Sequence, residues 1–206
     1  MIYTNIFLII FAYIIGAIPT GFLVAKAKGV DIRKTGSGNI GATNIMRTLG
    51  TKFGIGVLIL DFLKAFLFVT VYKNFTDTGI NLVLISLFII LGNIFPIFLK
   101  FKGGKGVATS SGVFAALIPK PFLIALLFFL IITSISKYVS LGSLVGVVVL
   151  FSITVYNFIF LKNVDIWILI FVFIVLIAVF IKHRQNIGRL LAGNENRINF
   201  KKKNEK

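Results

Sequence analysis

The sequence predicts an all-α integral membrane protein built as a bundle of seven transmembrane helices, some of the central ones short or partial. Of the 206 residues, 58% are hydrophobic, and the mean hydropathy is +1.02. A soluble domain of this length could not bury so much apolar surface. Seven apolar stretches alternate with short polar loops, and most of the positive charge falls in every second loop. That alternation is typical of membrane proteins with basic cytosolic loops.

The charge and residue counts narrow the kinds of partner and site that the protein is expected to have. The chain has 22 Lys and Arg against 6 Asp and Glu, a net charge of +16. Because the basic residues lie at the ends of apolar stretches, they favour contact with anionic membrane lipids over nucleic-acid binding. The absence of Cys excludes disulfides and thiolate nucleophiles. With the single His183 and six carboxylates, we expect no metal site.

The expected spans form one transmembrane domain over residues 1–197, followed by a basic tail over 198–206. The spans are Asn5–Ala25, Phe53–Tyr72, Ile80–Leu99, Val107–Ile118, Pro121–Ser136, Leu141–Leu161 and Val164–Ile181. A full crossing needs roughly 20 residues, so the fourth and fifth are short. They are expected to form a helical hairpin that turns at residues 118–121, with the fourth reaching only partway.

The charge distribution predicts the orientation. No Lys or Arg precedes the first apolar run, which argues against a cleaved signal peptide and places the N-terminus outside. With seven spans, the segments 26–52, 100–106, 137–140 and 182–206 face the cytosol and carry 18 of the 22 basic residues. Merging the fourth and fifth spans would put the highly basic C-terminal segment outside, against the positive-inside rule.

The first cytosolic loop contains a candidate anion site. Residues Gly36 to Gly41 match G-x-G-x-x-G, but a membrane span precedes them instead of a strand, so a dinucleotide-binding fold is rejected. Glycines still let backbone amides approach an anion, and a following helix start adds positive charge. The candidate contacts are Ser37, Gly38, Asn39, Thr43, Asn44 and the cation Arg47. The alternative is a flexible interfacial loop.

The second cytosolic loop places three glycines around one lysine at the start of an apolar run. Gly103, Gly104, Lys105 and Gly106, followed by Thr109, form a candidate phosphate nest. The spacing of a P-loop is absent. Loops also use such sequences simply for turns.

The remaining polar segments are less specific. Tyr138 in the third loop is best interpreted as an interfacial aromatic residue. In the C-terminal segment, His183 and Asn186 are three residues apart and would share a helix face. Arg184 and Arg189 are equally well explained by lipid headgroups, and Glu195 by a structural tie to a basic loop.

Two charges lie inside the second span. Asp61 and Lys64 are three residues apart, roughly 12 Å into the helix. Buried charges of this kind pair or serve a pathway. A structural ion pair is the favoured interpretation, and a proton relay is the alternative.

Together these segments resemble the bacterial membrane acyl-phosphate:glycerol-3-phosphate acyltransferases, the PlsY family. The resemblance covers the chain up to Arg197. It rests on residues 18–21, 36–47, 61–64, 103–109, 138–141 and 183–195, in this order and spacing. One departure is Gly92-Asn93 before Phe95-Pro96, where many members have Gly-His.

The resemblance implies transfer of a fatty acyl group from acyl phosphate to the 1-position of sn-glycerol 3-phosphate. The products are 1-acylglycerol 3-phosphate (lysophosphatidate) and inorganic phosphate, in the first acylation of phospholipid synthesis. It implies a multi-pass protein of the bacterial cell membrane with a cytosolic active site, in contact with membrane lipids and with other enzymes of phospholipid synthesis as possible partners. It assigns catalytic or binding roles to Ser37, Asn39, Thr43, Asn44, Arg47, Lys105, His183 and Asn186, glycerol-phosphate binding to residues 103–106, and a structural role to Glu195.

Since an acyl phosphate is already activated, no cofactor is expected. Arg47, Lys105 and loop amides would hold two phosphates together. The proton of the attacking hydroxyl would go to His183 or, as we favour, to the donor's own phosphate; a covalent acyl-Ser37 is the less favoured route. The alternative function is an organophosphate anion transporter, which should concentrate polar groups near the bilayer midplane.

Overall fold

The computed structural model describes residues 2–74 and 79–198, and within these ranges the regular structure is entirely helical. The predicted basic tail therefore lies almost wholly outside the described residues. The α-helices are α1 (Ile2–Ala17), α2 (Thr20–Ala27), α3 (Ala42–Leu49), α4 (Thr51–Lys73), α5 (Ile80–Ile94), α6 (Val107–Leu117), α7 (Pro119–Ser136), α8 (Val139–Tyr156), α9 (Ile166–Lys182) and α10 (Arg184–Leu191). Two short 3-10 helices, η1 (Ile32–Lys34) and η2 (Ile97–Leu99), and a π-helical stretch, η3 (Asn157–Leu161), complete the set.

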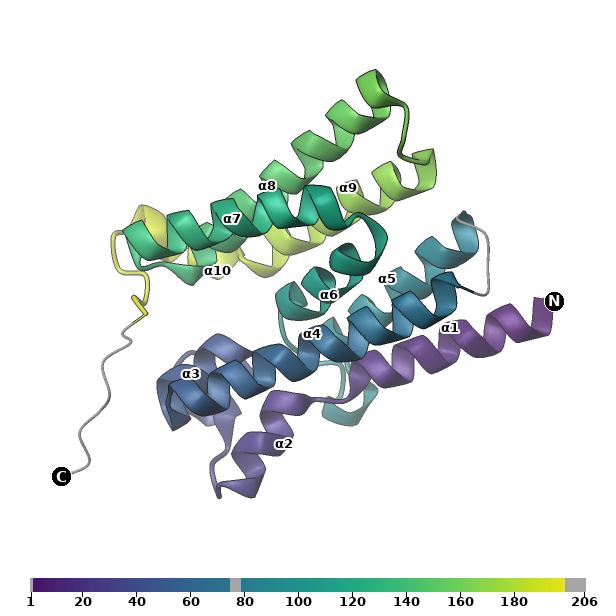
Figure 1. Ribbon diagram of the computed structural model, residues 1–206. Coiled ribbons are helices and arrows are strands. Elements are labelled where there is room, and N and C mark those ends of the chain that lie inside the picture. The colour runs from purple at the N-terminus through teal and green to yellow at the C-terminus, as the bar shows by residue number, and fades with distance from the viewer. Residues whose placement is uncertain (1, 75–78, 199–206) are drawn as a thin grey trace.

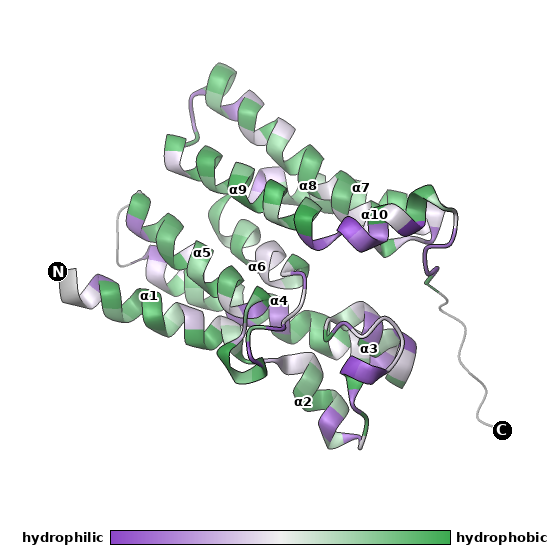
Figure 2. Ribbon diagram, turned by 180° about the vertical axis from the view of Figure 1, so that it is seen from behind, coloured by the Kyte–Doolittle hydropathy of each residue, from purple (hydrophilic) through white to green (hydrophobic). Residues whose placement is uncertain are grey.

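The helices form two groups with the short helix α6 between them (Figure 1). One group holds α1, α4 and α5, with α2 and α3 at one end. The other holds α7, α8 and α9, with α10 at the corresponding end. Figure 2 shows that the spans are hydrophobic along their length and that hydrophilic residues gather at α3, α10 and the tip of α2. The polar loops that the sequence assigned to one face thus lie together.

The number of long spans differs from the seven expected. Within the residues that the structure describes, five helical segments are long and apolar enough to cross a membrane, or six if the bent pair α9–α10 counts as one span. Helix α6 has 11 residues, or roughly 16 Å, about half of a 30 Å hydrocarbon core. The turn expected at residues 118–121 is present, because α7 begins at Pro119, whose missing N–H is tolerated at a helix start.

The first and third expected spans are each found as one long apolar segment, Thr4–Ala27 and Ile80–Leu99, but the α-helix within each is interrupted. The first is interrupted at Ile18–Pro19, between α1 and α2. The third ends as an α-helix at Ile94, just before Phe95 and Pro96, since the residue before a proline is disfavoured in the helical region. The last span bends by 58° at His183 into α10.

The break in the first span is held by the charges on α4. Lys64 Nζ donates to the carbonyl oxygens of Gly16 and Ile18, at 3.2 and 3.0 Å, and pairs with Asp61 Oδ1 at 2.7 Å. Thr20 Oγ1 donates to the same carboxylate oxygen at 2.8 Å. The expected ion pair is therefore present. Lys64 also donates to backbone carbonyl groups that the break leaves without a helical partner, and Asp61 accepts from the threonine just after the break.

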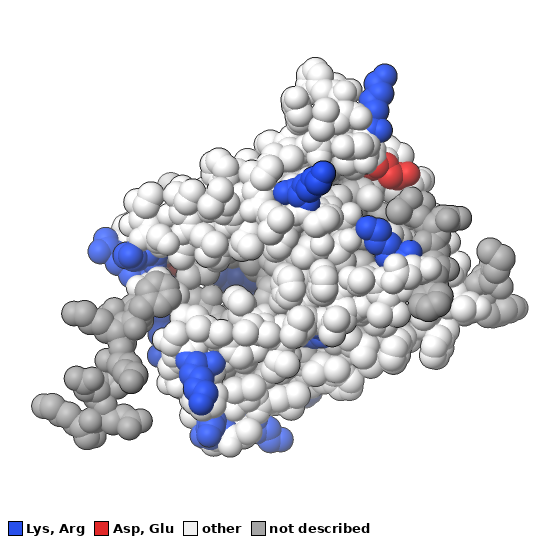
Figure 3. Space-filling model, viewed as in Figure 1, with Lys and Arg blue, Asp and Glu red and all other residues white. Residues whose placement is uncertain are grey.

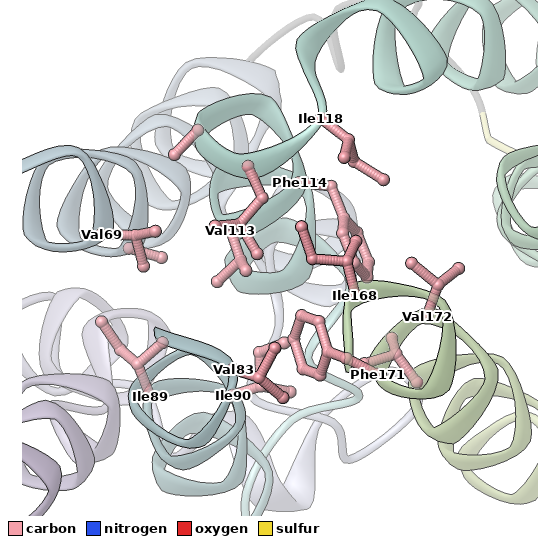
Figure 4. Packing of buried hydrophobic residues seen from close by; sticks show 14 of the residues in the cluster. Val69, Val83, Ile89, Ile90, Val113, Phe114, Ile118, Ile168, Phe171 and Val172 are labelled. Atoms are coloured by element: carbon pink, nitrogen blue, oxygen red, sulfur yellow. The ribbon is translucent and has the colours of Figure 1, made fainter. Parts of the chain in front are cut away.

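Helix α6 is the centre of the hydrophobic core. Figure 4 shows Val113 and Phe114 of α6 facing side chains from α4, α5 and α9. The rings of Phe114 and Phe171 lie 5.4 Å apart between centroids. By contrast, many large apolar side chains on the outer faces of the long helices are exposed, as expected where a protein meets lipid tails.

Glycines allow the closest helix contact. A Cβ atom added to Gly16 of α1 would lie 2.0 Å from the carbonyl oxygen of Ile89, and one added to Gly92 of α5 would lie 2.2 Å from that of Tyr13. Small residues at such crossings let helix backbones pack directly against each other.

Candidate active site

The loop between α2 and α3 is folded around Asn44. Asn44 Oδ1 accepts a hydrogen bond from the backbone N–H of Ser37 at 2.9 Å, and Nδ2 donates to the carbonyl oxygens of Thr35 and Asn39 at 3.0 and 2.8 Å. The side chain is almost fully buried. Its amide thus holds its own loop together. The substrate contact expected for Asn44 from the sequence stays a prediction.

Helix α3 begins where the first loop ends, as the sequence indicated. Gly41 is the residue before its first turn, and Asn39 Oδ1 accepts from the Gly41 N–H at 2.8 Å. Gly36 and Gly38 have φ of +58° and +71°, a region that favours glycine. Ser37 is therefore held at the tip of a turn. Arg47 lies in the second turn of α3.

The second loop rests on the C-terminal end of α5. Gly104 N–H donates to the carbonyl oxygen of Asn93 at 3.1 Å. A Cβ atom on Gly103 would lie 2.3 Å from Pro96 Cδ, so only glycine fits there. Gly106, with φ of +77°, is the residue that starts α6. This packing fixes the position of Lys105.

Lys105 begins a chain of hydrogen bonds that connects the second glycine loop to α10 and the C-terminal segment. Its ammonium donates to Asn186 Oδ1, and Asn186 Nδ2 donates to Glu195 Oε1 at 2.6 Å. Glu195 also accepts from Ser140 Oγ at 2.9 Å and from Arg189 Nε at 2.7 Å. The third loop, α10 and the C-terminal segment are thus joined to the glycine loop.

Burial and this chain of contacts shift the pKa values of Lys105 and Glu195. Burial lowers the pKa of the Lys105 ammonium to about 8, with Arg189 and Arg47 adding to the effect and Glu195 opposing it. Burial would raise the pKa of Glu195, but the hydrogen bonds from Asn186, Arg189 and Ser140 outweigh it and lower that pKa. Glu195 is therefore an anion that balances the nearby cations Lys105 and Arg189. Its hydrogen bonds tie the C-terminal segment to Ser140 at the third loop and to Asn186 and Arg189 of α10.

His183 lies at the bend between α9 and α10 and is buried. Its Nδ1 lies 2.8 Å from the carbonyl oxygen of Val179, which requires a proton on Nδ1 and leaves Nε2 as an acceptor. Burial, and then the charge of Lys105, lower the pKa of the imidazole to about 4. At neutral pH the ring is neutral.

These elements surround one cavity of about 1070 Å³. Figure 3 looks into a hollow between the two helix groups, in which basic side-chain atoms are visible. Most of the expected site residues line the cavity: Ser37, Asn39, Thr43, Asn44, Arg47, Gly104, Lys105, Gly106, His183 and Asn186, together with Asp61 and Glu195. Gly38, Gly103, Thr109 and Lys64 are not among the lining residues; Thr109 is fully buried behind the glycine loop.

The cavity also has contacts that the sequence analysis did not assign to the site. Asn93, Ser140 and Arg189 line it. Arg189 had been equally compatible with lipid headgroups, but it pairs with Glu195. Asn93 had been noted only as a departure from a family pattern. No short motif marks these residues, because each reaches the cavity through the packing of distant segments.

From its polar end the cavity continues as an apolar arm. The arm is lined by aromatic and aliphatic residues of α4, α6, α7 and α8, among them Phe62, Phe114, Phe122, Phe129 and Leu150. Its lining also includes Leu58 of α4 and Leu123 of α7, which are exposed on the outer surface. The arm is therefore open sideways between α4 and α7. Residues of α6 line the arm, and the 11 residues of this helix span roughly 16 Å, close to the ~15 Å of one bilayer leaflet.

The chain matches the family model described as glycerol-3-phosphate acyltransferase over residues 6–193. A glycerol-3-phosphate acyltransferase of Desulforamulus reducens is 46% identical, covering 97% of this chain and 98% of the relative. One of Aquifex aeolicus is 42% identical, covering 94% of this chain and 98% of the relative.

Solved structures agree with these sequence relatives. The crystal structure of PlsY, an integral membrane glycerol 3-phosphate acyltransferase, in its glycerol 3-phosphate form has a TM-score of 0.88 at 40% identity, covering 95% of this chain and 96% of that one. The lysophosphatidic acid form of PlsY has a TM-score of 0.85 at 39% identity, with 96% of each chain covered. These matches favour an enzyme over the transporter alternative. The chain is an integral membrane protein that belongs to the glycerol-3-phosphate acyltransferase family.

Proposed function

We propose that this protein transfers a fatty acyl group from acyl phosphate to the 1-position of sn-glycerol 3-phosphate. The oxygen of the primary hydroxyl forms an ester bond with the acyl carbonyl carbon, and the bond from that carbon to the phosphate oxygen breaks. The products are 1-acylglycerol 3-phosphate and inorganic phosphate. The acceptor is supported by the family and by the PlsY structures in their glycerol 3-phosphate and lysophosphatidic acid forms.

The observation that carries the proposal is the two-part cavity. Its polar end collects Arg47, Lys105 and the amides of two glycine loops, which suit phosphate oxygens. Its apolar arm has the length of a membrane acyl chain and opens toward the bilayer between α4 and α7. A donor with a phosphate head on a fatty acyl tail fits both parts at once.

In this mechanism the cations hold two anionic substrates side by side. The ammonium of Lys105 and the backbone N–H groups of Lys105 and Gly106 would bind the phosphate of the glycerol substrate, since the N–H of Gly104 is already bonded to Asn93. Arg47 of α3 and Ser37 of the loop before it would bind the phosphate of the donor. Screening the repulsion between two phosphates and orienting the hydroxyl are the main demands, since the acyl group needs no further activation.

The proton of the hydroxyl passes to the departing phosphate in the route we favour. His183 has an acceptor nitrogen, but its lowered pKa makes the imidazole a weak base at neutral pH. The ring would accept a hydrogen bond from the hydroxyl and orient it. The phosphate of the donor gains basicity as its bond to the acyl carbon breaks, because the leaving group becomes inorganic phosphate, and it can therefore take the proton.

We also propose a topology of seven segments with the N-terminus outside, the C-terminus in the cytosol and the site at the cytosolic face of a bacterial cell membrane. It combines the five long spans with α9 and the short α6, which would reach only partway. The chain has no Cys, so single cysteines can be labelled without background. Lys102→Cys and Arg184→Cys should react only from the cytosolic side, and Asn163→Cys only from the outside; labelling of residues 102 and 184 from opposite sides would overturn this topology.

The activity is tested with the purified protein, acyl phosphate and glycerol 3-phosphate, with a chelator and without nucleotide. We expect 1-acylglycerol 3-phosphate and one inorganic phosphate per ester formed. Acyl-CoA is supplied in a parallel reaction. Product from acyl-CoA alone would contradict the proposed donor, whereas no product from either donor would contradict the acyltransferase activity of this chain.

A further inference from the structure

Asn93 has an unusual position for a side chain that no motif assigns to the site. It lies in the last turn of α5, directly under the second glycine loop, and its carbonyl oxygen holds the N–H of Gly104. Its side-chain Oδ1 would be 3.4 Å from a Cβ atom on Gly104. The Asn93 amide is therefore next to the residue that precedes Lys105, on the wall of the cavity.

The amide of Asn93 is also available. It is half-buried and makes no hydrogen bond within residues 2–74 and 79–198. The other inner asparagines are engaged: Asn44 by its own loop, Asn186 by Lys105 and Glu195, and Asn39 through its oxygen by Gly41. A polar side chain on the cavity wall without a protein partner is a natural contact for a ligand, because its donor and acceptor atoms are open to the cavity.

The chemistry of the group indicates what it would contact. An amide offers a donor and an acceptor side by side, which matches a hydroxyl, since a hydroxyl also both donates and accepts. The cations nearby suit phosphate oxygens, which only accept. We infer that Asn93 binds the C2 hydroxyl of glycerol 3-phosphate and makes the site specific for the glycerol backbone; this inference rests on the proposed function.

The test compares two acceptors that differ only at that hydroxyl. Glycerol 3-phosphate and 3-hydroxypropyl phosphate both carry a phosphate and a primary hydroxyl, but the second lacks the C2 hydroxyl. The measured quantity is the ratio of kcat/KM for the two acceptors within each variant, which does not depend on the fraction of folded enzyme. We expect the wild-type protein to favour glycerol 3-phosphate at least tenfold, because a site built to bond a hydroxyl discriminates against its absence.

Asn93→Leu, which keeps the size and removes the hydrogen bonds, should bring this ratio at least tenfold closer to one, mainly through a loss on glycerol 3-phosphate. Asn93→Ala should do the same. Asn93→His, which restores one donor and one acceptor, should keep the ratio within about threefold of wild type. Asn163→Leu, on the exposed loop between α8 and α9, is the matched control and should leave it unchanged.

The possible outcomes separate the two hypotheses. Equal losses on both acceptors in Asn93→Leu, or an unchanged ratio, would overturn the role of Asn93 and leave the proposed function in place. A wild-type protein that acylates neither acceptor from acyl phosphate would overturn the proposed function and this inference with it.

Discussion

The ammonium of Lys105 is hydrogen-bonded to the side-chain oxygen of Asn186, which lies 81 residues further along the chain. Asn186 in turn donates to Glu195. The cation that the glycine loop presents to the cavity is therefore positioned by the C-terminal part of the protein. Variants in either segment should affect the same step.

Lys105→Ala should lower kcat/KM for glycerol 3-phosphate at least tenfold, with much of the loss in KM. The reason is the loss of a charge-assisted bond to the substrate phosphate. The measurement is steady-state kinetics with varied glycerol 3-phosphate. Lys102→Ala, an exposed lysine of the same loop, is the control; equal effects of the two changes would mean that only the general charge of the loop matters.

Arg47→Ala should also lower activity at least tenfold, but the loss should be clearest when acyl phosphate is varied. The guanidinium lies on α3, across the cavity from the glycine loop, and its planar fork suits a phosphate. Lys52→Ala, an exposed cation just beyond α3, should have little effect. Wild-type kinetics in Arg47→Ala would remove this residue from the mechanism.

The pH dependence should show an alkaline limb and no limb from His183 near 6.5. Lys105 has a pKa lowered to about 8, so it is charged below that pH and kcat/KM for glycerol 3-phosphate should fall above it. Lys105→Arg keeps its charge to higher pH, so its limb should move upward. An unmoved limb would show that another group titrates.

His183 adds a stability effect in the acid range. Its pKa is about 4 in the folded protein against an ordinary 6.5, so the unfolded chain binds a proton between these values and the folded protein does not. The contribution of His183 to stability should be complete above pH 6.5 and be lost as the pH falls toward 4. The comparison is thermal unfolding of wild type and His183→Gln across this range.

Glu195→Gln should destabilise the C-terminal segment and lower activity together. The carboxylate accepts bonds from Ser140, Asn186 and Arg189, and hydrogen bonds to charged groups contribute about 1.5–3 kcal/mol. We expect a lower melting temperature and a smaller kcat. Asp165→Asn, an exposed helix cap on the opposite loop, is the control. A normal melting temperature with lost activity would argue for a direct role of Glu195 in the chemistry.

Lys64→Met should destabilise the protein more than the double variant Asp61→Asn/Lys64→Met. Removing only the lysine leaves a buried carboxylate without its ion partner, which typically costs about 3–5 kcal/mol, whereas removing both charges costs less. The measurement is the melting temperature of the purified protein. A double variant as unstable as the single one would assign the main effect to the bonds from Lys64 to Gly16 and Ile18.

Much of the fold follows from local sequence. Helix α4 runs from Thr51 to Lys73, against the expected 53–72, because a predominantly apolar stretch of this length has few alternatives to a helix in a membrane. The break at Pro19 could not be placed from composition, since it depends on Lys64 reaching it from another helix.

The sequence predicts most of the polar residues that line the cavity, but not how their side chains are oriented. Glycine loops and isolated polar residues on one face indicate an anion site, and most of those residues line one cavity. Sequence spacing does not say which way an amide points: Asn44 turns to its own loop, while Asn93 turns to the cavity. Those orientations depend on contacts between residues far apart in the chain.

The order in which the protein is synthesised gives the Glu195 contacts a further consequence. Every helix through α10 precedes Glu195 in the chain, so a nascent protein has all of its apolar segments before it has the anion that holds Asn186 and Arg189. A chain that stops short of this residue should still insert into the bilayer but remain inactive. Catalytic competence is thereby delayed until Glu195 itself has been synthesised.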